Sequence, residues 1–222
     1  MNKYLILVII SLCLVISACT CPHSGTIDQP ARTLLVYIAG DNNLMGEVAD
    51  EIKALQAGWN PHHGTLLVYV DLPVAGGCFL RIHDTTIIDT LAVYGPEDSA
   101  SAETFGRVIA SVGKDFPADS YGLIFFSHSS GWLPLGSLQS PSRQSRSVGQ
   151  DASAGTEMEL SDFADAITLD FDYIVFETCL MGGVEVAYAL KDKARYMLAS
   201  PAELLSPGFT RVYPDALRYL TD

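Results

Sequence analysis

The chain has few basic residues, and this scarcity excludes one class of partner. Its 222 residues include 13 lysines and arginines against 26 aspartates and glutamates, which gives a formal net charge of −13. Phosphate backbones are bound by clusters of Lys and Arg, and no such cluster is visible, so we expect no nucleic acid partner. The acidic balance is compatible with cationic substrates, although it is also a common means of keeping a protein soluble.

Cysteines are also scarce, and their positions argue against a disulfide framework. Two of the five, Cys13 and Cys19, lie at the N-terminus, which leaves Cys21, Cys78 and Cys179 in the remaining chain. Three thiols do not form a paired framework, and no C-x-x-C motif occurs outside the N-terminal region, so a thiol redox protein is a poor alternative. Cys179 follows an apolar run, where an unpaired cysteine has either a packing role or a chemical one.

The chain lacks an apolar run long enough for a comfortable membrane span, which needs about 20 residues. Residues 4–16 are apolar except for Ser11 and Cys13, and they follow the basic start Met1-Asn2-Lys3. This pattern is typical of a secretory signal peptide. The following Ile16-Ser17-Ala18-Cys19 resembles the lipobox of bacterial lipoproteins, which implies cleavage before Cys19 and lipidation of its thiol. The alternative is an ordinary secretory signal with a chance cysteine.

The expected organisation is therefore a signal peptide (1–18), a lipidated tether (19–31) and one folded domain (32–222). Lipid on Cys19 would anchor the protein to a membrane, which predicts an exported lipoprotein of the cell envelope, at the outer membrane or cell surface.

Apolar segments with strand character alternate with segments of helical periodicity. The expected strands are residues 32–39, 64–72, 121–127, 171–176 and 196–200, with a hairpin over 79–93, and the expected helices are residues 44–58, 102–112, 160–167 and 184–191. Fully apolar strands between helices indicate a mostly parallel sheet covered on both faces, so the predicted class is a doubly wound α/β fold. Residues 133–157 form a polar stretch between two of these elements.

Two reactive residues stand at the ends of two expected strands. His128 follows the strand at 121–127, and Cys179 stands shortly after the strand at 171–176. If these strands are neighbours, both side chains emerge at the same edge of the sheet, where α/β proteins bind their ligands. A thiol becomes a good nucleophile when an imidazole or a helix N-terminus lowers its pKa. The backbone N–H of Cys179 and one from the turn at Ser129 are candidates for an oxyanion hole.

These motifs together resemble the clostripain family of cysteine peptidases, relatives of caspases, gingipains and legumain. The resemblance covers roughly residues 32–210 and is carried by four segments: Leu34–Leu44, His128–Trp132, Phe176–Met181 with Glu185 after it, and Ala199–Glu203. It implies a caspase-like fold, Cys179 as the nucleophile and His128 as the general acid and base. It also implies an endopeptidase that cleaves proteins or peptides after Arg, or after Lys.

The resemblance extends to substrate binding and maturation, with two departures from the family pattern. Glu177 stands two residues before the cysteine, where Asp is usual, and Glu203 is a second candidate for pairing with a basic side chain. Ser129 replaces the usual Gly after the histidine and would be strained if its φ were positive. The stretch 133–157 is similar to a segment in which some members cleave themselves, which makes Arg143 and Arg146 candidate processing sites; an ordinary surface loop is the alternative.

Family members are usually considerably longer, and residues 213–222 read as a helix cut short, which suggests a truncation or a fragment. The second hypothesis is therefore a catalytically silent surface lipoprotein that binds peptides in the same cleft. We expect no metal site, because His62 and His63 are adjacent and no His/Cys cluster surrounds them. Some relatives need calcium, but no acidic loop with ligand spacing supports a calcium cofactor here.

Overall fold

The computed structural model describes residues 32–132 and 147–220. The predictions for the signal peptide, for lipidation at Cys19 and for processing at Arg143 and Arg146 therefore lie outside the described residues.

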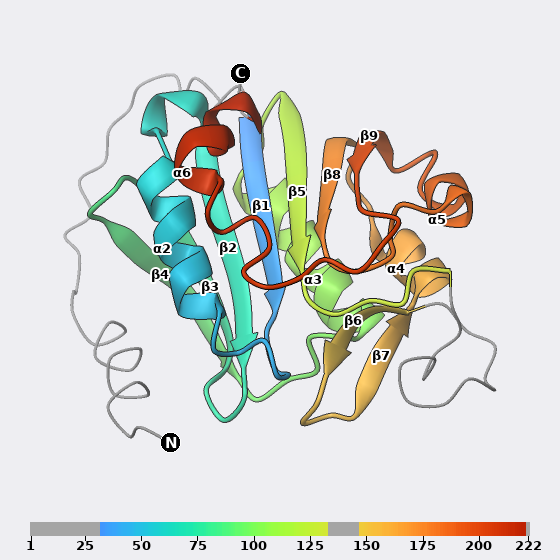
Figure 1. The fold of residues 1–222 in the computed structure, drawn as a ribbon. Coiled ribbons are helices and arrows are strands. Elements are labelled where there is room, and N and C mark those ends of the chain that lie inside the picture. Colours follow the sequence, from blue (N-terminus) through green and yellow to red (C-terminus); the bar gives the residue numbers. More distant parts are fainter. Residues whose placement is uncertain (1–31, 133–146, 221–222) are drawn as a thin grey trace.

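A seven-stranded sheet with strand order β4-β3-β2-β1-β5-β8-β9 forms the centre of the domain, as Figure 1 shows. The strands are β1 (Arg32–Ala39), β2 (Thr65–Leu72), β3 (Gly76–Ile82), β4 (Ile88–Gly95), β5 (Ser120–Phe126), β8 (Phe171–Glu177) and β9 (Ala194–Leu198). The five strands from β2 to β9 in this order are parallel, whereas β3 and β4 form an antiparallel hairpin at one edge. This arrangement confirms the predicted mostly parallel α/β fold.

Helices cover both faces of the sheet, because alternate residues of each central strand point to opposite sides. Leu35 and Tyr37 of β1 belong to one core, and Leu34 and Val36 belong to the other. The first core is covered by α3 (Ala102–Asp115), α4 (Leu160–Ala166) and α5 (Val184–Ala189). The second is covered by α2 (Val48–Gly58), α6 (Tyr213–Ala216) and η2 (Leu217–Leu220), with α2 and α6 side by side in Figure 1.

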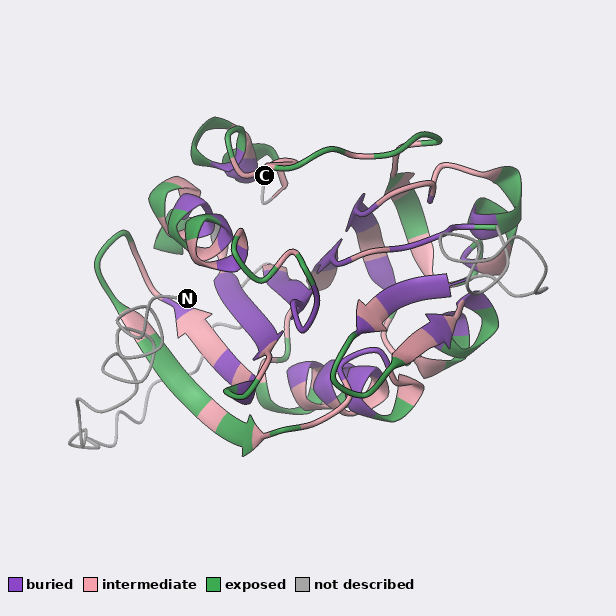
Figure 2. Ribbon diagram, turned by 60° about the horizontal axis from the view of Figure 1, so that its bottom comes forward, coloured by how far each residue is buried: buried purple, intermediate pink, exposed green. Residues whose placement is uncertain are grey.

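The outer strands are much less buried than the central ones, as the colouring of Figure 2 shows for β4. Strands β1, β2 and β5 are almost wholly buried, which explains their continuous apolar sequences. A helix that is both long and apolar enough to cross a membrane does not occur among the described residues.

Two sequence predictions need correction. The expected helix at 44–58 begins only at Val48, because Asn42 accepts the N–H of Leu44 with its side chain and holds residues 42–47 in turns. The polar stretch 133–157 is not one long loop, since its second half contains β6 (Ser147–Asp151), which pairs with β7 (Thr156–Glu159) in a separate hairpin. Both strands are short and polar, so they lack the apolar alternation that marks a strand in sequence.

Candidate active site

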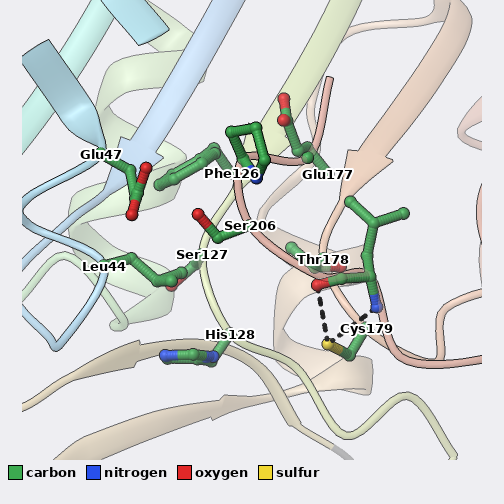
Figure 3. Close-up of a pocket in the computed structure, with 12 residues that line it drawn as sticks. Leu44, Glu47, Phe126, Ser127, His128, Glu177, Thr178, Cys179 and Ser206 are labelled. Carbon is green, nitrogen blue, oxygen red and sulfur yellow. Dashed lines mark hydrogen bonds between the residues drawn. The ribbon is translucent and has the colours of Figure 1, made fainter. Parts of the chain in front are cut away.

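His128 and Cys179 meet at the carboxyl edge of the sheet. Strands β5 and β8 are parallel neighbours, and Phe126 at the end of β5 is in register with Glu177 at the end of β8. His128 and Cys179 each follow these positions by two residues, so both side chains emerge at one edge and line one cleft (Figure 3). The condition on which the sequence analysis depended, that the two strands are neighbours, is met.

The imidazole of His128 is held by a residue that the sequence analysis left without a role. Its Nε2 lies 2.5 Å from Oδ1 of Asn43, which follows β1 in the turn at residues 40–43. If Nε2 donates its proton to Asn43, then Nδ1 is the nitrogen free to exchange a proton in the cleft. Burial lowers the pKa of His128 below its usual range, and the negative charge of Glu157 opposes this shift. The ring is therefore neutral at neutral pH.

The thiol of Cys179 contacts the chain that follows β9. The Leu204 N–H donates a hydrogen bond to Sγ at 3.3 Å, and the Leu204 carbonyl oxygen lies 3.8 Å from the same sulfur, as the dashed lines in Figure 3 mark. Ser206, Pro207 and Gly208 continue along the wall of the cleft. Residues 204–208, which we call the covering segment, thus lie directly against the candidate nucleophile.

The loops that carry the two residues are tied to each other. The Ser129 hydroxyl donates a hydrogen bond to the Cys179 carbonyl. Gly131 has φ +58°, and a Cβ atom there would lie 2.1 Å from the carbonyl oxygen of Leu180, so only glycine allows this close approach. Ser129 itself does not have a positive φ, and the expected strain at this position is therefore not present.

The oxyanion role of Ser129 and Cys179 remains a prediction. Within the turn after His128, the Ser130 N–H already donates to the Ser147 carbonyl at 3.1 Å, which removes it as a donor to substrate. Ser129 is buried, and its hydroxyl is used by the loop contact with Cys179.

Glu177 lines the cleft, but its carboxylate is already engaged within the protein. One oxygen accepts the backbone N–H of Phe209, and the other accepts the Tyr213 hydroxyl at 2.5 Å. Only 3% of the residue is exposed, and in Figure 3 its carboxylate points away from Cys179. Pairing with a substrate guanidinium would require residues 204–213 to move. Glu203, the other predicted binding residue, is exposed and is not among the residues that line the cleft.

A second carboxyl group, that of Glu51 on α2, lies buried beside Glu177. The Thr210 hydroxyl donates to Glu51 Oε2 at 2.6 Å, whereas Oε1 is buried without a hydrogen-bond partner. Burial and the charge of Glu177 raise the pKa of Glu51 to about 9. Burial raises the pKa of Glu177 too, but the Tyr213 and Phe209 hydrogen bonds oppose that shift. At neutral pH Glu51 therefore carries a proton. Its sequence position, among helical residues of α2, gave no sign of this role.

A mostly parallel sheet, covered on both faces, with a thiol and an imidazole in one cleft at its carboxyl edge, defines the caspase-like class of fold. The sequence model of the clostripain family of peptidases matches residues 36–221, which is most of the chain. The protein belongs to the clostripain family.

Solved structures agree with this assignment. A secreted C11 cysteine protease from Bacteroides thetaiotaomicron, in complex with an irreversible peptide inhibitor, is 32% identical, with a TM-score of 0.76 over 86% of this chain and 54% of its own. An inactive zymogen C11 protease from Parabacteroides distasonis is also 32% identical, with a TM-score of 0.74 over 89% of this chain and 56% of its own. The B. thetaiotaomicron protease iotapain, at 21% identity, shares the fold with a TM-score of 0.74 over 87% of this chain and 58% of its own.

The chain spans a little over half the length of these solved relatives. No curated protein sequence gives a significant match.

Because of the buried carboxyl group of Glu51, the free energy of unfolding should fall as the pH rises. Its folded pKa of about 9 lies above the ordinary value, so the folded state binds more protons than the unfolded state between about pH 4.5 and pH 9. The stabilisation that protonated Glu51 gives below this pH window is therefore lost as the pH rises through the window. Glu51→Gln removes the titration and should raise the free energy of unfolding at about pH 8 by roughly 1–3 kcal/mol, with little change near pH 4.

Thermal or urea unfolding across this pH range measures the effect, with the exposed Glu103→Gln on α3 as the control. A pH slope in Glu51→Gln equal to that of the wild type would show that Glu51 is already ionised in the folded protein.

Proposed function

We propose that the domain is a cysteine endopeptidase in which Cys179 is the nucleophile and His128 is the general acid and base. The observation that carries this proposal is that the two side chains, from neighbouring parallel strands, line the same cleft. The family relation supports it, since one solved relative at 32% identity is described as a C11 cysteine protease and another as an inactive zymogen C11 protease.

The proposed reaction follows from the chemistry of the two groups. His128 takes the proton of the Cys179 thiol, and the resulting thiolate attacks the scissile carbonyl carbon and forms a C–S bond, while the carbonyl π electrons move to oxygen. When the tetrahedral intermediate collapses, the C–N bond breaks and His128 donates a proton to the leaving amine. Water, deprotonated by His128, then cleaves the thioester. Asn43 acts as a positioning residue, because its contact with Nε2 fixes the orientation of the ring.

The acidic cleft suits a basic substrate side chain. Glu177 and Glu47 both line the cleft, and a carboxylate pairs bidentately with a guanidinium, which favours Arg and permits Lys. Glu177 would take this role once residues 204–213 move aside and release its carboxylate from Phe209 and Tyr213. Glu47 lies partly exposed at the other wall of the cleft, and it has no such contact to break among the described hydrogen bonds.

Self-processing at Arg143 or Arg146 is the proposed maturation step. The flanks of this segment support it, because both are fixed beside the candidate dyad. Two hydrogen bonds join the flanks to each other, since the Ser130 N–H donates to the Ser147 carbonyl and the Gly149 N–H donates to the His128 carbonyl at 2.9 Å. A chain that leaves and returns within a few residues of His128 has a short path to its own cleft.

The remaining proposal concerns the location of the protein. The relative from B. thetaiotaomicron is described as secreted, and the signal-like N-terminus of this chain favours export in the same way. We propose cleavage before Cys19, a lipid on its thiol and a tether over residues 19–31, which would place the domain at the surface of a cell-envelope membrane.

A catalytically silent, peptide-binding lipoprotein is the second candidate. One observation favours it: the covering segment occupies one wall of the cleft, and its Leu204 N–H donates a hydrogen bond to the Cys179 sulfur, so the thiol is engaged by the protein's own backbone in this conformation. The two candidates differ in what becomes of a bound peptide, which is cleaved by the first and retained by the second.

The domain lacking residues 1–19 should cleave fluorogenic peptides that end in Arg or Lys, and not those that end in Asp or Asn. Cys179→Ala and His128→Ala should each reduce kcat/KM by at least about 1000-fold, since either change removes an essential step. Circular dichroism and Tm of each variant check that the fold is kept. A well-folded protein that binds these peptides without turnover would instead support the silent candidate.

Three acidic residues can be compared directly as determinants of basic specificity. Glu177→Gln and Glu47→Gln should each lower kcat/KM for an Arg peptide by roughly 10-fold, because a charge-assisted pair is worth about 1.5–3 kcal/mol. Glu203→Gln, outside the cleft, should leave it unchanged. A peptide with citrulline in place of Arg separates charge pairing from folding effects, since its cleavage should be insensitive to all three changes.

If Glu177→Gln weakens the cleavage of the Arg and citrulline peptides equally, then Glu177 acts only by holding residues 209 and 213 in place.

The double variant Arg143→Ala/Arg146→Ala should remain a single chain under conditions in which the wild type is converted to two fragments. Loss of the basic side chains removes the group that the acidic cleft recognises. Electrophoresis and intact-mass measurement give the cleavage position, with Cys179→Ala as the inactive reference and exposed Arg195→Ala as the matched control. A double variant that matures with the wild-type band pattern contradicts the proposal.

A further inference from the structure

The two loops that carry the candidate dyad meet again further along the chain. Trp132 lies four residues after His128, and Gly183 lies four residues after Cys179. A Cβ atom at Gly183 would lie 3.2 Å from Cδ1 of Trp132, which is tighter than an ordinary contact, so the indole ring lies directly against the backbone at Gly183. The φ of Gly183 is −88°, which any residue adopts, so it is the close approach of the indole that favours a glycine here.

Large apolar side chains are exposed at this meeting point. Trp132 is 50% exposed, and Val184 and Tyr188 of α5 are 76% and 71% exposed. Val184 directly follows Gly183, and Tyr188 comes four residues later, so both side chains lie on one face of the helix. Single exposed apolar residues are common, but three that gather beside the candidate dyad indicate a binding surface. We call Trp132, Val184 and Tyr188 the apolar shelf.

The backbone beneath the shelf is fixed by hydrogen bonds to the chain that follows β9. The Leu180 N–H donates to the Ala202 carbonyl at 3.1 Å, and the Gly182 N–H donates to the Ser200 carbonyl at 2.8 Å. A large, rigid aromatic ring that lies against a fixed loop loses little conformational entropy when a ligand packs on it. The shelf is therefore organised before any ligand binds.

The shelf is separate from the cleft that contains Glu177. Its three residues are not among those that line the cleft, and in Figure 3 the labelled cleft residues lie on one side of the His128–Cys179 pair. In the proposed reaction the acyl half of the substrate stays on Cys179, with its basic side chain in the cleft, and His128 protonates the amine of the other half. The leaving half therefore extends past His128, toward the loop that leads to Trp132.

We propose that the apolar shelf binds the residue that follows the scissile bond, and that Trp132 selects an aromatic or large aliphatic side chain there. The proposal rests on the endopeptidase function proposed above. An aromatic side chain of the substrate can stack on the indole ring or pack edge-to-face against it. Oε2 of Glu185 lies 3.3 Å from the Cβ position at Gly183, so a carboxylate borders the shelf and disfavours an acidic side chain there.

Internally quenched peptides that are identical up to the arginine, and differ only in the residue after it, test this selection. For residues 19–222, the chain left by the proposed signal cleavage, kcat/KM should be about 10-fold higher with Phe than with Gly after the arginine, and lowest with Asp. Trp132→Ala should reduce the preference for Phe to less than about 2-fold, whereas Trp132→Phe should keep most of it. Exposed Tyr219→Ala on η2 is the matched control and should leave the preference unchanged.

The methyl ester of the same arginine peptide has no residue after the arginine. Trp132→Ala should therefore hydrolyse this ester as fast as the wild type does, because the dyad and the cleft are unchanged. Loss of ester hydrolysis in Trp132→Ala would overturn the proposal and assign Trp132 a structural role.

Peptide binding to the inactive Cys179→Ala variant gives a readout that does not depend on turnover. Fluorescence anisotropy should give a Kd about 10-fold lower for the Phe peptide than for the Gly peptide, and Cys179→Ala/Trp132→Ala should bind the two equally. Equal binding of both peptides to Cys179→Ala, or a preference for Phe that survives the loss of Trp132, would overturn the proposal. If the wild type cleaves no peptide or ester while this binding preference is present, the endopeptidase function fails and the binding role of the shelf stands.

Discussion

A small polar network around Asn42 and Ser127 holds together the parts on which the site depends. The Asn42 amide donates to the Ala39 carbonyl at 2.8 Å and to the Gln150 carbonyl at 3.0 Å. The Ser127 hydroxyl donates to the same Ala39 carbonyl and accepts the Gln150 N–H. These bonds join the ends of β1 and β5 to β6, and because the groups are buried, each bond would be costly to leave unmade.

The candidate site residues on the histidine side are adjacent in sequence to members of that network. His128 follows Ser127, and Asn43 follows Asn42. The position of the imidazole is therefore a consequence of these few hydrogen bonds.

Features that are encoded in a short stretch of sequence could be predicted, whereas features that depend on residues far apart in the chain could not. Strands β1, β2, β5 and β8 are buried on both faces, so their apolar runs were visible, and their parallel order placed His128 and Cys179 at one edge. The role of Asn43 was not visible, because an asparagine after a strand is ordinary turn chemistry until its partner, 85 residues away, is known. Glu51 was likewise hidden, since a single acid in a helix is normally solvated.

The acidic residues also show what local sequence patterns cannot predict. Glu177 was chosen because of its place beside Cys179, but the structure adds Phe209 and Tyr213, which occupy its carboxylate. The position of this residue close to the nucleophile in sequence placed it correctly at the cleft. It did not show that its carboxylate is already hydrogen-bonded within the protein. The C-terminal segment that binds this carboxylate has no periodic sequence pattern between β9 and α6. Its path depends on contacts with buried residues elsewhere in the chain and not on the local conformational preference of its own residues.

The two sides of the cleft are therefore held by different kinds of interaction. The histidine side rests on a neutral polar network that is fully satisfied, whereas the cysteine side rests on a buried pair of carboxyl groups and on backbone contacts to Cys179. Gly208 shows how close the latter packing is, because a Cβ there would lie 2.3 Å from the Glu177 carboxylate, at a φ of +58°. The cysteine side depends on one proton and on a segment without regular secondary structure. Opening it therefore costs less free energy than breaking the satisfied network on the histidine side. Movement of the covering segment that frees Glu177 would then leave the imidazole in place.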